Sequence, residues 1–213
     1  LAAGLSLSHN AVVQESDGVW SAIGDPTDAA CAVAGWKLNG DVTKFASLHP
    51  RLHEQVFDSV RKRMSTVHEY EGERWLFVKG ATSSVLPLCS HRFHTNDAVA
   101  FGEEEAVGYR NRVGALADRA MRVITFAARK LSADEALDPE HSLEHDLVLL
   151  GSVGIIDPPR AEVADAIARC HRAGIDVKMI TGDQQATAEA IASDLGCDDG
   201  SSIGGRELRD MDE

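Results

Sequence analysis

Cysteine is scarce in this sequence of 213 residues, and none of it is arranged to hold a metal. The four cysteines are Cys31, Cys89, Cys170 and Cys197, which form no CxxC pair and have spacings that match no zinc site. Unpaired thiols are typical of a reducing compartment, because disulfides persist mainly in oxidising ones. We therefore expect a cytoplasmic location and no metal centre built by this chain.

Positive charge is scarce as well. Lys and Arg total 21 against 34 Asp and Glu, which gives a formal net charge of -13 at pH 7. A surface that binds nucleic acid needs a basic stripe, and anionic lipid repels an acidic surface. We therefore expect neither nucleic acid nor a lipid surface as a partner.

Long apolar runs are absent. The longest, residues 147–156, has ten residues and is too short to cross a bilayer. No basic stretch of a signal peptide opens the chain, and Leu1 indicates a cut within a longer protein. With 44% hydrophobic and 26% charged residues, the composition is that of a folded domain. We expect no direct membrane insertion and, because no heptad repeat or long apolar edge is present, a monomer.

The first part of the chain, residues 1–150, mixes strand and helix patterns irregularly. A strand is predicted at residues 19–23, and a helix follows to about Lys37, with Asp25 as its N-cap and Pro26 in its first turn. Further elements are two strands that form a hairpin around Glu71-Gly72, a helix after Gly80, a helix over residues 103–119 and a strand over residues 122–129. The pattern predicts an α+β domain with an antiparallel sheet.

The second part, residues 151–213, alternates more regularly. The apolar run at residues 147–156 reads as a buried strand, and helices are predicted at residues 160–172 and 186–195 around a strand at residues 175–180. Such a βαβα order is typical of a parallel sheet. The pattern predicts an incomplete α/β piece.

One motif resembles a metal site without its context. Residues 141–145 read His-Ser-Leu-Glu-His, a pattern of zinc proteases, but Pro139 and the strand that begins at Leu147 leave no room for the helix that such a site needs. We therefore expect no zinc site there.

Five short segments carry the chemistry of this sequence. Among them, an aromatic residue followed by clustered cations suits a nucleotide, because the ring can stack on the base while the cations meet phosphate. In chain order the segments are Gly24-Asp25-Pro26-Thr27-Asp28, Phe57-Asp58-Ser59-Val60-Arg61-Lys62-Arg63-Met64-Ser65, Lys79-Gly80-Ala81, Asp157-Pro158-Pro159-Arg160 and Met179-Ile180-Thr181-Gly182-Asp183.

In this order and at this spacing, the five segments resemble the calcium-pump-like (type II) branch of the P-type cation-transporting ATPases. The resemblance implies a nucleotide-binding domain over residues 1–150 and a partial phosphorylation domain of haloacid-dehalogenase-like fold over residues 151–213. It implies ATP as ligand, with Mg²⁺ arriving on the nucleotide, and a cytoplasmic position beside the membrane. The partners would be the remaining phosphorylation, actuator and transmembrane domains of the parent pump.

The same resemblance implies roles for single residues. Phe57 would stack on the adenine, Lys62 would lie on the rim of the pocket, Lys79 would lie deep beside the base, and Arg122 would reach the phosphates. Asp28 would face the base side, although the family usually has Glu at this position. Three further residues complete the predicted nucleotide-binding set: Thr27, Met64 and Gly80, where the absence of a side chain allows close backbone approach.

The resemblance also implies functions for the last two segments. Thr181, Gly182 and Asp183 would form a phosphorylation-domain motif in which the threonine contacts the transferred phosphoryl group. Asp157, Pro158, Pro159 and Arg160 would form the hinge between the two domains. The sequence contains neither the family's DKTGT motif with the nucleophilic aspartate nor its GDGxND segment. We therefore expect ATP binding without turnover in this chain.

Two other functions are compatible with parts of the sequence. Thr181-Gly182-Asp183 also occurs in small haloacid-dehalogenase-like phosphatases, but these need a DxD nucleophile motif, and Asp210-Met211-Asp212 lies in a charged tail. A non-catalytic interaction module that has lost its nucleotide would give a folded protein without a response to ATP.

Overall fold

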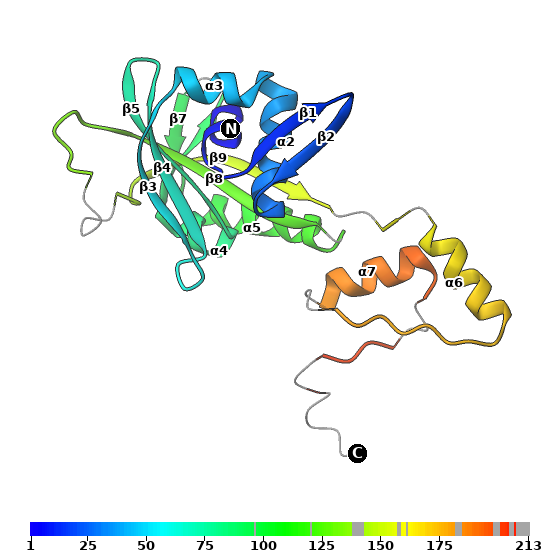
Figure 1. Cartoon of the computed structure of the whole chain (residues 1–213). Coiled ribbons are helices and arrows are strands. Elements are labelled where there is room, and N and C mark those ends of the chain that lie inside the picture. The colour runs from blue at the N-terminus through cyan, green and yellow to red at the C-terminus, as the bar shows by residue number, and fades with distance from the viewer. Residues whose placement is uncertain are drawn as a thin grey trace. The chain divides into compact units, whose positions relative to one another are not determined.

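The computed structural model divides into two compact units (Figure 1). The first comprises Leu1–Arg110 and Val123–Ile155, and the second comprises Asn111–Arg122 and Ile156–Glu213. None of the helices within the described ranges is both long enough and apolar enough to span a membrane. The residues that the structure describes are 1–95, 97–119, 121–137, 143–156, 159–160, 162–181, 185–197, 201–204 and 207.

The first unit is built on a seven-stranded sheet in the order β3-β4-β5-β8-β9-β6-β7. Strand β9 runs parallel to β6, whereas the pairs β3–β4, β4–β5, β5–β8 and β6–β7 are antiparallel. The α+β class is therefore confirmed, but the expectation of a purely antiparallel sheet is wrong, because β9 adds beside β6 in the same direction. The bounds are Arg51–Asp58 for β3, Arg63–Tyr70 for β4, Glu73–Gly80 for β5, Cys89–His94 for β6, Asp97–Ala100 for β7, Arg122–Leu131 for β8 and Leu147–Ile155 for β9.

The predicted hairpin around Glu71-Gly72 joins β4 to β5. Both turn residues have positive φ, 53° at Glu71 and 75° at Gly72. Two successive positive φ angles are the signature of the two-residue turn that matches the twist of the strands on either side. This turn sets the register that pairs Met64 with Lys79.

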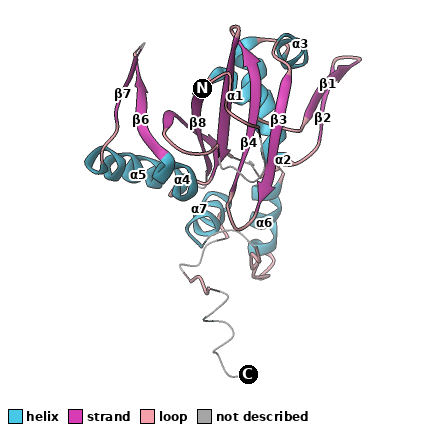
Figure 2. Ribbon diagram, turned by 90° about the vertical axis from the view of Figure 1, so that its left-hand side faces the viewer, coloured by secondary structure: helices cyan, strands magenta, loops and turns pink. Residues whose placement is uncertain are grey.

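Helices and a separate two-stranded ribbon complete the first unit. The ribbon pairs β1 (Val12–Ser16) with β2 (Val19–Ile23) and stands apart from the large sheet in Figure 2. Helices α1, α2 and α3 contact one another, and α1 contacts β5. The helices are α1 (Ala2–Leu7), α2 (Pro26–Asn39), α3 (Val42–Leu48), α4 (Thr82–Val85), the 3-10 turn η1 (Leu86–Leu88) and α5 (Glu103–Ala117), of which the residues from Asn111 onward are counted with the second unit.

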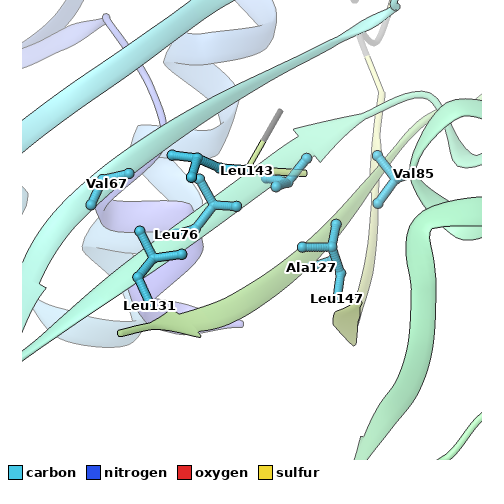
Figure 3. Packing of buried hydrophobic residues seen from close by; sticks show 8 residues of the cluster. Val67, Leu76, Val85, Ala127, Leu131, Leu143 and Leu147 are labelled. Atoms are coloured by element: carbon cyan, nitrogen blue, oxygen red, sulfur yellow. The ribbon is translucent and has the colours of Figure 1, made fainter. Parts of the chain in front are cut away.

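The two faces of the sheet bury different clusters, because successive residues of a strand point to opposite faces. One face carries the cluster in Figure 3, which consists of Val67, Leu76, Val78, Val85, Ala127, Leu131, Leu143 and Leu147. On the other face, Phe126 packs with Leu5 of α1 and Cys31 of α2. The second face therefore lies under α1 and α2 and is the one on which Lys79 and Met64 lie.

The second unit contains the two predicted helices, as α6 (Val163–Arg172) and α7 (Gln185–Leu195). Each is followed by a glycine with positive φ, 73° at Gly174 and 68° at Gly196. Residues 175–180, predicted as a strand, form none, and Ile180 is 97% exposed. A strand needs a neighbour for its backbone hydrogen bonds, and the apolar run predicted as its partner is β9, which belongs to the sheet of the first unit.

Candidate functional site

Two of the predicted site residues form a shielded ion pair. The Lys79 Nζ donates to the Asp28 Oδ1 at 2.5 Å, and the two side chains are only 6% and 14% exposed. The other Asp28 oxygen accepts the backbone N–H of Asn10 at 2.7 Å. A buried ammonium is stable only beside a counter-charge, so Lys79 depends on Asp28. Because Lys79 lies in β5 and Asp28 in the first turn of α2, the ion pair also joins these two elements.

The start of α2 is fixed by the predicted cap. The Asp25 carboxylate accepts the backbone N–H groups of Thr27 at 2.8 Å and Asp28 at 3.3 Å. Burial acts to raise the pKa of Asp25, but hydrogen bonds from Thr27 and Asp28 and the charge of Lys79 outweigh it, so this pKa lies below its usual value. The cap therefore orients the first turn, from which Asp28 reaches Lys79.

The stem of Lys79 lies between two buried apolar side chains. Lys79 of β5 is paired with Met64 of β4 on one side and with Phe126 of β8 on the other. Met64 is 3% exposed and Phe126 is fully buried. Cross-strand partners lie on the same face of the sheet, so the methylene groups of Lys79 lie between the side chains of Met64 and Phe126. The ammonium at the end of the side chain binds Asp28.

Gly80 is required by a close approach of two strands. A Cβ built there would lie 2.5 Å from the Lys62 carbonyl oxygen and 2.5 Å from the Arg63 Cβ. The next residue, Ala81, donates its N–H to the same Lys62 carbonyl at 3.0 Å. Lys62 and Arg63 of the protein therefore approach Gly80 closely, and the hydrogen bond from Ala81 holds the Lys79-Gly80-Ala81 segment against the turn between β3 and β4.

That turn displays Phe57 and Lys62. Phe57, next to the end of β3, is 61% exposed, and Lys62 is exposed with a φ of 54°. The Asp58 carboxylate holds the turn by accepting the N–H groups of Val60 at 2.9 Å and Arg61 at 2.7 Å. Lys62 has no ion-pair partner in the part of the chain that the structure describes, so its charge is open to solvent.

The two arginines on either side of Lys62 are paired with a carboxylate. Arg61 and Arg63 both bind the carboxylate of Glu144, whose side chain is 1% exposed. Glu144 belongs to the His-Ser-Leu-Glu-His pattern set aside above, and Leu143 and Glu144 precede β9 without forming a helix. Of the clustered cations expected to meet phosphate, Arg61 and Arg63 are therefore paired with Glu144, and Lys62 keeps its charge on the surface.

The remaining predicted residues lie elsewhere in the described chain or outside it. Arg122 is the first residue of β8 and is exposed, as are Thr181, Pro159 and Arg160. Four predicted residues lie outside the described residues: Asp157, Pro158, Gly182 and Asp183.

Two residues near Lys79 were missed by the sequence analysis. Both ring nitrogens of His9 are buried without a hydrogen-bond partner among the described residues. Burial, with the charges of Lys79 and Arg51, lowers the pKa of His9 to about 4, although Asp28 opposes this. Besides its bond to Asp28, Asn10 accepts from Arg51 at 2.5 Å and donates to Glu54 at 2.5 Å. The segment between α1 and β1 has no periodic pattern that could have indicated this.

Chemically, the first unit offers an exposed aromatic ring, a neutral buried ion pair and an open cation. Within the described ranges, no group of three or more His, Cys, Asp and Glu side chains could hold a metal ion. The exposed ring and the open cation suit a ligand that has both an aromatic and an anionic part.

Comparison with known proteins decides the family. Residues 1–162 match the family model described as "P-type ATPase, cytoplasmic domain N". The chain belongs to the P-type ATPase family. The match covers all of the first unit, including the Lys79–Asp28 pair and the Phe57 turn.

The relatives are P-type pumps of bacteria. The chain is 40% identical over 176 residues to "Calcium-transporting ATPase 1" of Bacillus cereus, covering 83% of this chain and 20% of the relative. It is 38% identical over 192 residues to "Calcium-transporting ATPase" of Bacillus subtilis, covering 89% and 21%. For "Cation-transporting ATPase pma1" of Synechocystis the values are 34% over 195 residues, 90% and 21%. The chain thus spans about a fifth of the length of these relatives.

Proposed function

We propose that this chain binds ATP as the nucleotide-binding domain of a cation-transporting P-type ATPase. The observation that carries the proposal is the exposed ring of Phe57, 61% accessible, near the end of β3, which leads into the turn that carries the open ammonium of Lys62. A base would stack on this exposed ring next to the cation, and base stacking contributes about 1–3 kcal/mol.

The charges of the site fit a nucleotide in one orientation. The Lys79–Asp28 pair is neutral as a unit and shielded, so it suits the uncharged base and its hydrogen-bonding edge. Thr27, Met64 and Gly80 would shape this end, because Thr27 adjoins Asp28 in α2 and Met64 lies beside Lys79. Lys62 and Arg122, both exposed, are the cations that would meet the phosphates.

The proposed role of the whole protein follows from the names of the relatives. ATP hydrolysis would drive the transport of a cation across the membrane, with this domain on the cytoplasmic face. ATP held by its base would leave the γ-phosphate free for transfer to an aspartate outside this chain. Mg²⁺ would arrive on the nucleotide and offset part of its phosphate charge.

Residues 151–213 would then be the beginning of the phosphorylation domain. In this proposal Thr181, Gly182 and Asp183 contact the phosphoryl group, and Asp157, Pro158, Pro159 and Arg160 form the hinge. A hinge of this kind lets a nucleotide domain carry its ATP toward the phosphorylation site.

The proposal is tested by isothermal titration of the 213-residue chain with ATP, with and without Mg²⁺. We expect one saturable site with or without the metal, because the proposed contacts are made by the base-stacking ring and by cations and need no metal held by the protein. Absence of binding at millimolar ATP would contradict the proposal and favour an interaction module without nucleotide. Release of phosphate by the chain alone would favour the phosphatase alternative.

A further inference from the structure

Among the described residues, Glu144 carries the most deeply buried carboxylate, and the proposed ATP contacts do not use it. The Glu144 side chain is 1% exposed. It accepts from Arg61 Nη1 at 2.9 and 2.8 Å, from Arg63 Nε at 2.5 Å and from Ser65 Oγ at 2.9 Å. All three donors belong to the β3–β4 hairpin and lie about 80 positions earlier in the chain. A buried carboxylate with its hydrogen bonds satisfied holds its donors firmly, since each lost bond leaves a charge unpaired.

Arg61 connects Glu144 to the backbone next to Phe57. Its second nitrogen, Nη2, donates to the Val56 carbonyl at 3.0 Å. Phe57 is the next residue, and the Asp58 carboxylate binds the N–H of Arg61 from the other side of the turn at 2.7 Å. One planar guanidinium therefore bridges Glu144 and the peptide that precedes Phe57.

The orientation of the Phe57 ring depends on its backbone, because the ring itself makes few contacts with other side chains. It is 61% exposed and makes no ring–ring contact with another aromatic side chain in the described part of the chain. Lys62, in the turn that follows β3, has an exposed side chain, while its carbonyl accepts from the Ala81 N–H at 3.0 Å. The positions of both side chains are thus set by the backbone of the turn.

We propose that Glu144 is a positioning residue of the nucleotide site. Through Arg61, it fixes the turn that displays Phe57 and Lys62, while Met64 on the opposite face of the hairpin lies beside Lys79. This inference rests on the proposed ATP binding and adds to it a residue that does not touch the nucleotide. Glu144 belongs to the His-Ser-Leu-Glu-His motif that resembles a zinc site, and the proposal gives it a role in holding the β3–β4 hairpin instead.

The test is a double-mutant cycle between Glu144→Gln and Phe57→Ala, with ATP affinity measured by titration of the 213-residue chain. Glu144→Gln should weaken ATP binding about fivefold in the wild-type background and less than about twofold when Phe57 is already Ala. Amide exchange at Val60 and Arg61, whose N–H groups bind Asp58, should accelerate in Glu144→Gln without nucleotide.

A matched control removes another carboxylate from an arginine without touching the hairpin. Glu135 binds Arg129 at 2.5 Å, and the two side chains are 23% and 15% exposed. Glu135→Gln should leave ATP affinity and the two amides unchanged. If Glu144→Gln prevents folding, Arg61→Lys serves instead, because lysine keeps the charge but cannot bridge Glu144 and the Val56 carbonyl. It should give the same loss of affinity and the same coupling to Phe57.

The outcomes separate the two proposals. If the wild-type chain binds no ATP, the proposed function is wrong and this inference falls with it. If the wild type binds ATP and Phe57→Ala weakens it, while Glu144→Gln and Arg61→Lys leave affinity unchanged, only the positioning role is wrong. An equal loss for Glu144→Gln in both backgrounds would also contradict it, because the effect would then not pass through Phe57.

Discussion

The ammonium of Lys79 and the carboxylate of Asp28 lie 2.5 Å apart, almost out of contact with solvent. The pair joins β5 of the sheet to the first turn of α2, elements that are separated by about 50 positions in the chain. Desolvation raises the cost of each charge alone, so the two residues depend on each other. Whatever binds beside Lys79 therefore meets a neutral pair and not an open cation.

Asp28→Ala should destabilise the fold strongly. It leaves the buried Lys79 ammonium without a counter-charge and the Asn10 N–H without its acceptor. We expect a loss of about 3 kcal/mol in the free energy of unfolding, measured by urea denaturation.

The double variant Asp28→Ala, Lys79→Met is the control for this interpretation. Methionine would place an apolar side chain between Met64 and Phe126 and remove the unpaired charge. It should recover at least half of the lost stability. If the double variant is less stable than Asp28→Ala alone, the ion pair is not the source of the loss.

Substitution of two glycines by alanine should have opposite effects. Gly80→Ala forces a Cβ to within 2.5 Å of the Lys62 carbonyl oxygen, so we expect a loss of about 1–3 kcal/mol. At Gly114, inside α5, no atom beyond the neighbouring helix backbone lies within 4 Å of the position that a Cβ would take, so Gly114→Ala should stabilise by about 0.5–1 kcal/mol. Thermal unfolding of both variants checks the two signs. A neutral Gly80→Ala would show that β4 and β5 can separate at this point without cost.

Stability should fall below neutral pH partly because of His9. Its pKa is about 4 in the folded chain, for the reasons of burial and positive neighbours given above, and about 6.5 in an unfolded chain. Between these values the unfolded state binds a proton that the folded state does not, so stability is complete above about pH 6.5 and declines as the pH falls toward 4. The full contribution is about 3 kcal/mol.

The measurement compares urea unfolding of wild type and His9→Gln at several pH values from 7.5 to 4. The slope of stability against pH should be smaller in the variant. His68, whose pKa burial also lowers, titrates in the same direction in both proteins and cancels in the comparison. Equal slopes would mean that His9 is already exposed to protons in the folded state.

The local elements with clear chemical signals could be predicted from the sequence. Asp25 as N-cap and Pro26 in the first turn predicted α2, and Glu71-Gly72 predicted the β4–β5 hairpin; the structure confirms both. It also confirms the two helices of the second unit. The strand at residues 175–180 was wrong, since strand formation depends on a partner that local pattern does not reveal. The edge strand β3 was not predicted, because all of its residues are exposed or only half-buried and their burial does not alternate.

The contacts of the site could be predicted only in part. The motifs identified Asp28 and Lys79 as neighbours in function, and the structure brings them together. The partners of Arg61 and Arg63 could not be predicted, because Glu144 lies about 80 positions away and was part of a misleading motif. No sequence pattern indicated the burial of His9, because its environment is formed by the packing of several elements. Stacking by Phe57 stays a prediction.

The most direct test of ATP binding compares Phe57→Ala with Phe93→Ala. Both rings are exposed, 61% for Phe57 and 52% for Phe93, but Phe93 lies on β6 and outside the proposed site. Both variants should keep their stability within about 0.5 kcal/mol, because surface substitutions change it little. In titrations with ATP, Phe57→Ala should bind at least about fivefold more weakly than wild type, as loss of a stacking contact requires, and Phe93→Ala should bind equally well. Undiminished binding by Phe57→Ala would contradict the proposed site.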